Sequence, residues 1–167
     1  MRAIPRVLLL LSAVALGLGL TVLPADAADS RASFLTHAQA AHQFRAAGIT
    51  WSSSGRCDDR DNPRCTSFTS IRQSTVTGVK TLKRASGCPI HLTGGTETGH
   101  AAGTYSHWNG FKLDIRRNDC VDRYITAKFA DMGMQEGWGH QFRAASGNLY
   151  TNEGRHWDIV YYTCGCA

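Results

Sequence analysis

The spacing of apolar positions along the chain predicts three helices. The first is expected over residues 33–47, with Ser33 as its cap and Gly48 as its stop. The second is expected over residues 67–86, where apolar side chains fall near one face, and the third over residues 121–132, ended by Gly133.

Strands are expected in the second half of the chain. Residues 111–115 alternate cleanly, with Leu113 on one face and Lys112 and Asp114 on the other. Three further segments have strand composition: residues 88–93, 148–150 and 156–162.

Two polar segments, residues 51–66 and 94–109, interrupt these elements and are expected to be loops. No internal repeat or long linker appears, so residues 28–66 and the core over residues 67–167 should form one domain. The order of elements predicts a small α+β fold, with helices packed on one face of an antiparallel sheet.

The first 27 residues have the pattern of a secretory signal. Arg2 and Arg6 precede an apolar run over residues 7–22, and Ala25 and Ala27 stand where a signal peptidase reads small residues. A membrane anchor is the alternative, but the run is short for a span and a cleavage site follows it. We therefore expect cleavage after Ala27 and an exported, extracellular chain without stable membrane insertion.

Charge narrows the choice of partner. Residues 1–27 carry a net +1 of the chain's +5, which leaves +4 on the exported part. This mildly basic balance suits an anionic partner such as a bacterial cell wall, and it is too weak to indicate nucleic-acid binding. No basic run interleaved with aromatic residues supports nucleic-acid binding either, and we expect a monomer associated with the wall.

Six cysteines follow the signal, which favours up to three disulfides in an exported chain of this size. Cys57 and Cys65 are the expected local pair, because their bond would close the polar loop between them. The Cys164-Gly165-Cys166 segment can be read as a metal or redox motif, but its single spacer residue and terminal position favour structural disulfides. The other candidates, whose pairing stays open, are Cys88, Cys120, Cys164 and Cys166.

Two segments carry candidate metal ligands. In the first, His107 ends a loop, Gly110 lets the chain turn into a strand, and Asp114 lies on the polar face of that strand. In the second, Glu153 precedes His156 by three residues at the entry to a strand. Imidazole and carboxylate ligands suit zinc, and three protein ligands leave a fourth position open, as in catalytic sites. We expect His107, Asp114 and His156 to hold one Zn²⁺ per chain, with Glu153 off the metal as the base that takes a proton from water.

Several of these residues have alternative roles. Asp114 can pair with Arg116 or Lys112, and His156 can be a satisfied core histidine. Lys112 can bind a substrate carboxylate, although pairing with Asp114 is favoured. Trp157 should pack in the core, whereas Trp108 can either pack or line a substrate cleft.

Four other histidines lie outside these motifs. His37 and His42 are expected to be ordinary surface residues of the first helix. His91 lies on an expected strand and His140 in a loop rich in Gly and Trp, and neither is assigned a role.

The motifs resemble a known superfamily. The segment from Thr93 to His100, Ser106-His107-x-x-Gly110-x-x-x-Asp114 and Glu153-x-x-His156 are similar to the zinc D-alanyl-D-alanine peptidases. That superfamily includes D,D-carboxypeptidases, the dipeptidases of vancomycin resistance, L-alanyl-D-glutamate endopeptidases and the zinc-binding signalling domain of hedgehog. The resemblance spans residues 67–162 and implies ligand roles for His107, Asp114 and His156 and the base role for Glu153. It also implies hydrolysis of peptide bonds in peptidoglycan.

One departure concerns an arginine. The peptidases usually carry it in a turn before the first ligand, where it polarises the scissile carbonyl, but residues 94–97 here contain none. His100, in a Gly-His pair similar to the hedgehog branch, can replace it or hold substrate, or can simply order the loop. Arg72 is another candidate. The departure keeps open a non-catalytic zinc-binding domain of the hedgehog kind, and a metal-free, disulfide-stapled binding protein is a third reading.

Overall fold

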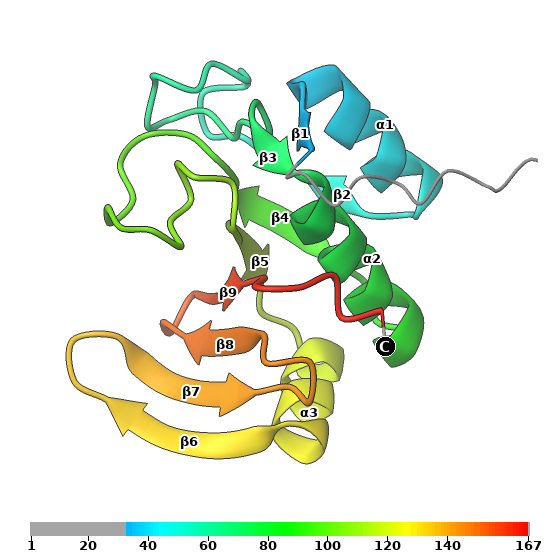
Figure 1. Cartoon of the computed structure of the whole chain (residues 1–167), viewed down its shortest axis with the longest axis vertical. Coiled ribbons are helices and arrows are strands. Elements are labelled where there is room, and N and C mark those ends of the chain that lie inside the picture. Colours follow the sequence, from blue (N-terminus) through cyan, green and yellow to red (C-terminus); the bar gives the residue numbers. More distant parts are fainter. Residues whose placement is uncertain (1–32, 167) are drawn as a thin grey trace, which may run out of the picture.

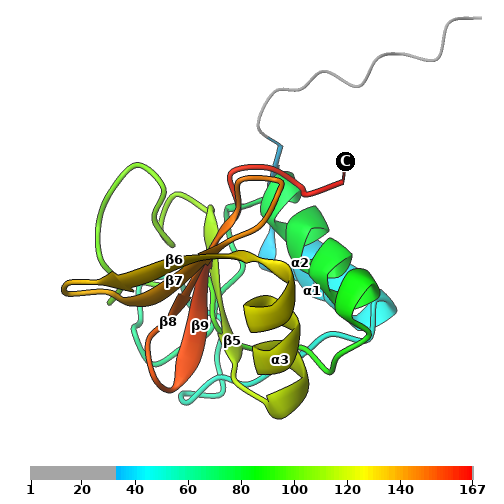
Figure 2. The ribbon, with the colours of Figure 1, turned by 90° about the horizontal axis from the view of Figure 1, so that it is seen from below.

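The computed structural model describes residues 33–166, so the expected secretory signal lies outside the described residues. The fold is α+β, as predicted, and three helices cover one face of a mostly antiparallel sheet (Figures 1 and 2). In chain order the elements are β1 (Phe34–Leu35), α1 (His37–Ala46), β2 (Thr50–Trp51), β3 (Ile71–Arg72), α2 (Gln73–Ser86), β4 (His91–Gly94), β5 (Lys112–Arg116), α3 (Asp119–Lys128), β6 (Ala130–Gln135), β7 (Gly139–Arg143), β8 (Leu149–Asn152) and β9 (His156–Val160).

The main sheet has seven strands in the order β2-β4-β5-β9-β8-β7-β6. Among the strands of residues 33–166, only β2 and β4 pair in parallel, and β1 and β3 form a separate two-stranded sheet. At the centre, Asp114 of β5 lies opposite Asp158 of β9. Side chains alternate along a strand, so Asp114, Asp158 and His156 share the face that the helices leave open.

The helix-covered face of the sheet carries the hydrophobic core. Leu113 and Ile159 contribute from the central strands, and Phe44 and Val79 from α1 and α2. Trp157 is only 1% exposed, which confirms its expected place in the core. Its indole Nε1 donates to Asp122 Oδ1 at 2.7 Å, so the buried ring also satisfies its polar atom.

Two helices begin later than predicted. Thr36 caps α1 instead of Ser33, because its side chain accepts from the Gln39 N–H while the Gln39 side chain accepts from the Thr36 N–H. Helix α2 begins at Gln73 rather than at residue 67, since the preceding β3 pairs with β1 and Ser70 has a positive φ of 61°.

The prediction for the third helix was wrong at its C-terminal end. Helix α3 stops at Lys128, and after Phe129 the six residues Ala130–Gln135 form β6. Phe129 leaves the helix in an extended conformation and packs 4.6 Å from the Tyr150 ring. Gly133, expected to end the helix, lies within β6 at a register shift. The β6–β7 hairpin was not predicted, because its sequence lacks clear alternation of apolar and polar residues.

Two disulfides form among the described residues. Cys57 pairs with Cys65, as expected. Cys88 pairs with Cys120, and this bond links the segment before β4 to helix α3. The expectation of a third was wrong: Cys164 and Cys166 are free. The other four cysteines are paired with one another. Within this chain, Cys164 could therefore form a disulfide only with Cys166, two residues away. No helix within residues 33–166 is long and apolar enough to cross a membrane.

Candidate metal centre

The four predicted site residues meet on the open face of the sheet. His107 comes from the loop between β4 and β5, Asp114 from β5, and Glu153 and His156 from the turn into β9. Asp114 Oδ1 lies 3.3 Å from His107 Nε2 and 3.6 Å from His156 Nε2. Glu153 Oε2 lies 3.2 Å from His156 Nε2. Segments up to 49 residues apart, from His107 to His156, thus contribute to one cluster.

Two glycines make this convergence sterically possible. Gly110 has a φ of +74°, and a Cβ there would lie 2.5 Å from the Ser70 carbonyl oxygen. This is the turn into β5 that the sequence predicted. A Cβ on Gly94 would lie 2.3 Å from Asp114 Oδ2, so a larger residue would displace the carboxylate.

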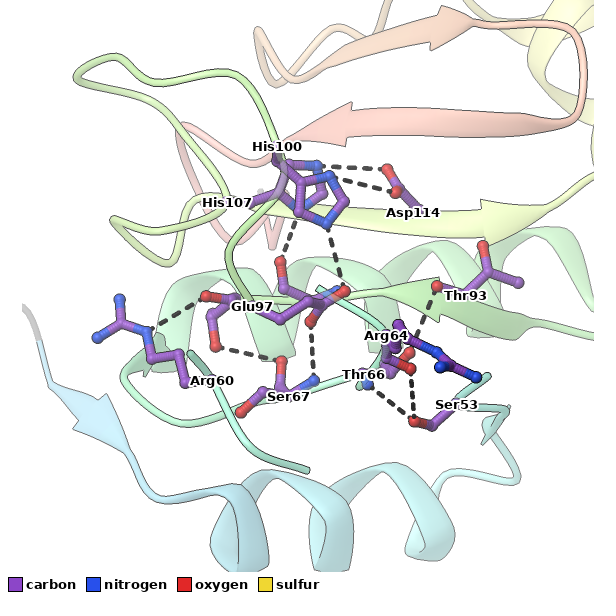
Figure 3. A network of polar contacts seen from close by, with 12 residues as sticks. Ser53, Arg60, Arg64, Thr66, Ser67, Thr93, Glu97, His100, His107 and Asp114 are labelled. Carbon is purple, nitrogen blue, oxygen red and sulfur yellow. Dashed lines mark hydrogen bonds and ion pairs between the residues drawn. The ribbon is translucent and has the colours of Figure 1, made fainter. Parts of the chain in front are cut away.

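His107 is oriented as a ligand would be. Its side chain is 2% exposed, and Nδ1 lies 2.6 Å from the Gly95 carbonyl oxygen (Figure 3). When Nδ1–H donates to that carbonyl, Nε2 carries the lone pair, which is the arrangement that outer hydrogen bonds impose on metal-binding histidines. Within the described residues, His107 Nε2 and Asp114 Oδ1 are buried without a hydrogen-bond partner. A cation would satisfy both atoms.

The electrostatics of this cluster favour positive charge. Burial alone lowers the pKa of His107, but Asp114 and Asp158 outweigh burial and raise that pKa to about 10. Two buried carboxylates thus converge on His107 and favour a positive charge there. A bound divalent cation would meet the same two negative charges.

Two separations around Asp114 Oδ1 are close to those expected between the ligand atoms of a tetrahedral site. In a tetrahedral site with zinc–ligand distances of ~2.1 Å, neighbouring ligand atoms lie ~3.4 Å apart. The values of 3.3 and 3.6 Å around Asp114 Oδ1 are close to that spacing. Two imidazoles and one carboxylate, with the cluster partly open to solvent at His156, also match the donor set of catalytic zinc sites.

His100 lies close to the same group. Of the described residues, His100, His107 and Asp114 form a compact set of potential ligands, with one atom of each within 4.8 Å of the others. However, the rings of His100 and His107 are stacked, with centroids 3.7 Å apart and planes 16° apart. Ring lone pairs lie in the ring plane, so an ion between two stacked rings would lie outside both planes. The stacking disfavours joint coordination by His100 and His107, but His156, the predicted third ligand, is not part of this compact set of described residues, although its Nε2 lies 3.6 Å from Asp114 Oδ1.

Glu97 holds His100 and the loop in place, a role that the sequence did not reveal. It is 3% exposed, and Oε2 accepts from the Ser67 N–H at 2.8 Å and the Gly95 N–H at 3.1 Å (Figure 3). Oε1 lies 3.2 Å from His100 Nε2. Burial alone would raise the pKa of Glu97, but these hydrogen bonds, led by the one to His100, outweigh it and lower that pKa.

This anchoring predicts a pH-dependent contribution to stability. A carboxyl whose pKa is lower in the folded chain stabilises the fold above its unfolded value, near 4.5, and loses that contribution as pH falls through the folded value. We expect Glu97→Gln to lower the free energy of unfolding at pH 7 by about 1–3 kcal/mol. Urea melts between pH 7 and 3 should show the gap to the wild type closing below about pH 4.5. The control is Glu136→Gln at an exposed position; a gap that is constant with pH would contradict the role of the Glu97 charge.

Asp158 is a second residue that the sequence reasoning missed. It is buried, and its Oδ2 lies 2.7 Å from Lys112 Nζ and 3.7 Å from His107 Nε2. Its place two residues after His156 on one strand face was the available signal. The expected pairing of Lys112 with Asp114 was wrong, because Lys112 reaches across to the neighbouring strand instead. Asp158 thus places a second carboxylate near His107 Nε2.

Glu153, the expected base, lies beside His156 on the more exposed side of the cluster. Its side chain is 30% exposed, and its backbone N–H donates to the His156 carbonyl at 3.1 Å, which fixes the turn. Burial raises the pKa of Glu153, and Asp158 raises it further, while His156 opposes both. A raised pKa brings a carboxylate closer to the value that suits a general base at neutral pH.

Arg72, a candidate to replace the missing arginine, is held elsewhere. Its Nε donates to the Asn109 carbonyl at 3.0 Å, and its guanidinium lies 3.8 Å from the Phe111 ring centroid and 4.8 Å from that of Phe34. None of these contacts is with His107, Asp114 or His156, so His100 remains the candidate for the role of the missing arginine.

Arg60 positions the segments that carry the site. Its Nε donates to the Thr96 carbonyl at 3.2 Å, Nη2 donates to the Trp108 carbonyl, and the guanidinium lies 3.7 Å from the Trp108 ring centroid. The Thr98 N–H also donates to the Arg60 carbonyl at 2.8 Å. Arg60 lies in the loop closed by Cys57–Cys65, so that disulfide indirectly supports both sides of the site.

We expect Arg60→Met to lower the free energy of unfolding by about 1–2 kcal/mol, since methionine keeps some apolar contact with Trp108 but loses both hydrogen bonds. Thermal or urea unfolding measures this change. Arg64→Met, at an exposed position of the same loop, is the control and should differ little from the wild type. Equal losses in the two variants would show that Arg60 contributes only as a generic loop residue.

The remaining aromatic and histidine predictions had mixed outcomes. Trp108 is 45% exposed and lines a cavity of about 320 Å³ beside His100, so it is not a core residue.

His37 was wrongly expected at the surface: it is half-buried, and its Nδ1 accepts from the Phe68 N–H at 3.1 Å. His42 is exposed as expected. His140 lies in β7 rather than in a loop and pairs with Asp131.

Comparison of the chain with models of protein families, with curated proteins and with solved structures finds no match. The chemistry of the site is therefore argued from its own contacts. Those contacts describe a buried His107–Asp114 pair whose facing atoms, Nε2 and Oδ1, have no hydrogen-bond partner among the described residues, flanked by His156 and Glu153 on the more exposed side.

Proposed function

We propose that the chain is an exported zinc-dependent peptidase that hydrolyses peptide bonds of bacterial peptidoglycan, as a D,D-carboxypeptidase or a related endopeptidase. One observation carries the proposal: His107 Nε2 and Asp114 Oδ1 lie 3.3 Å apart, buried and without hydrogen-bond partners in the described chain, while His156 and Glu153 adjoin them. The resemblance of the motifs to the zinc D-alanyl-D-alanine peptidases supplies the substrate class.

In this proposal His107, Asp114 and His156 hold the metal. Bound zinc would polarise the scissile carbonyl and bring the pKa of water to about 7. Glu153, on the exposed side, takes the proton from the attacking water and passes it to the leaving amine. His100, held by Glu97, faces Asp114 and can donate a hydrogen bond to the oxyanion that develops on the substrate.

Export and the cell wall enter the proposal from separate observations. Two disulfides form, which suits an oxidising compartment, and a signal-like segment begins the chain. The exported part carries a net +4, which suits an anionic wall. These features support a location outside the cell, and the peptidase reading makes wall peptide the substrate there.

A second candidate is a zinc-binding domain without turnover. It is favoured by the positions of Arg60 and Arg72, which are both engaged by backbone carbonyls and aromatic rings instead of facing the metal centre. Glu153 opposes this candidate, because a purely structural zinc site has no use for a base beside its most exposed ligand.

One preparation tests the proposal. The exported protein is purified, its zinc content is measured, and release of amino acids or peptides from peptidoglycan is followed by mass spectrometry. We expect about one zinc per chain and hydrolysis that a chelator abolishes and added zinc restores. A folded protein without zinc affinity would refute both candidates, and bound zinc without hydrolysis of any wall peptide would favour the binding domain.

A further inference from the structure

A cavity of about 340 Å³ lies on the same face of the sheet as the metal centre. The β6–β7 hairpin forms one side, and Tyr105, from the loop that also carries His107, lines another. Lys112 lines the cavity and connects it to the metal centre, because Asp158 contacts both Lys112 and His107. A ligand in the cavity would therefore adjoin a substrate held at the metal centre.

Exposed aromatic rings form the walls of this cavity. Trp138 is 51% exposed, Tyr105 49% and Tyr162 42%. Tyr105 and Tyr162 contact each other edge to face, with centroids 4.8 Å apart. Large aromatic side chains are usually covered in a folded domain, so three half-exposed rings around one cavity indicate a surface that receives a ligand.

The rest of the lining combines polar side chains with the apolar Leu149 and Val160, and it has no unpaired charge. Gln141 donates to the Thr151 hydroxyl at 3.2 Å, and both residues line the cavity together with Gln135. Lys112 is the one charged residue of the lining, and Asp158 neutralises it at 2.7 Å. Amides and a hydroxyl between aromatic rings suit a ligand that is neutral, carries hydrogen-bonding groups and has apolar faces.

We propose that this cavity binds a sugar ring of the wall polymer, of the N-acetylated hexosamine class, beside the peptide that the metal centre cleaves. The C–H faces of a pyranose stack on aromatic rings, and its hydroxyl and acetamido groups pair with glutamine and threonine side chains. A purely apolar side chain would leave these polar groups desolvated without partners, and an ionised one would find no free counter-charge. The inference rests on the proposed function for the choice of a wall sugar, but sugar binding itself needs neither zinc nor Glu153.

The test is isothermal titration of the purified protein with the β-1,4-linked tetramer of N-acetylglucosamine, with and without chelator. We expect binding that is independent of metal, and an affinity reduced about tenfold by Trp138→Ala, since stacking on that ring is lost. Met134→Ala is the matched control, because Met134 is 72% exposed on the same hairpin and lies outside the cavity lining. Trp138→Phe, which keeps a ring, should retain most of the affinity, and circular dichroism checks that each variant is folded.

Absence of tetramer binding to the folded wild type would overturn the inference, and so would equal affinities in the wild type and Trp138→Ala. A free wall peptide that binds with the same dependence on Trp138, while the tetramer does not, would assign the cavity to peptide instead. Hydrolysis of a sugar-free wall peptide is measured in parallel. Its absence, with tetramer binding intact, would count against the proposed function and leave the sugar site standing.

Discussion

Glu153→Gln is expected to lower kcat for wall-peptide hydrolysis by about 10²–10⁴-fold while leaving zinc bound. The amide has nearly the shape of the carboxylate, but it cannot accept the proton of the attacking water, and general-base catalysis contributes an effect of this size. Zinc content should stay near one per chain, because the proposed ligands are His107, Asp114 and His156. The measurement is steady-state hydrolysis of a defined wall peptide, with metal analysis of the same preparation.

Glu136→Gln is the matched control for this prediction. Glu136 is exposed, and apart from Glu97 and Glu153 it is the remaining glutamate of the chain. Its variant should hydrolyse the peptide like the wild type. Unchanged kcat in Glu153→Gln would remove Glu153 from the base role, and loss of zinc in that variant would make Glu153 a ligand.

His107→Ala is expected to abolish zinc binding altogether. The two remaining ligands make a poor site, and the imidazole removed here is the most deeply buried of those proposed, at 2% exposed. Asp114→Asn, which preserves volume, should also bind zinc much more weakly, because it removes the negative charge beside both histidines. Metal analysis after dialysis against zinc measures this loss.

Thermal unfolding provides a second measurement of the same loss. Zinc in thousandfold excess over its dissociation constant should stabilise the wild type by about 4 kcal/mol, and chelator should remove that increment. His107→Ala should show no difference with or without zinc, whereas His42→Ala, at an exposed position of α1, should behave like the wild type. A zinc-dependent shift that persists in His107→Ala would place the metal elsewhere.

Local periodicity was sufficient to predict which face of the central strand β5 is polar and which is apolar. In β5, alternation predicted that the side chains of Leu113 and Asp114 point to opposite faces of the sheet. The structure agrees, because Leu113 is buried in the core and Asp114 faces the site. The pleat of a strand makes such a pattern a direct consequence of local geometry. The Cys57–Cys65 pair was predictable for a similar reason, since the two cysteines close a short loop.

Element boundaries were less predictable, because tertiary contacts decide them. Helix α2 was expected to begin at residue 67, but the pairing of Ile71 with Leu35 holds the chain extended just before Gln73. The segment after Lys128 has no strong strand pattern, and it becomes β6 through pairing with β7. Neither outcome is encoded in a window of neighbouring residues.

The sequence by itself determined the residue types of the candidate metal centre and the faces on which they lie, because both depend on short spacings. Only the tertiary structure decided that Lys112 pairs with Asp158 instead of Asp114, and that Glu97 anchors His100 through backbone N–H groups of Ser67 and Gly95. Lys112 and Asp158 are 46 residues apart, and Ser67 and Glu97 are 30 apart. The register of the strands and the packing of the loops select such partners, and these are properties of the whole fold.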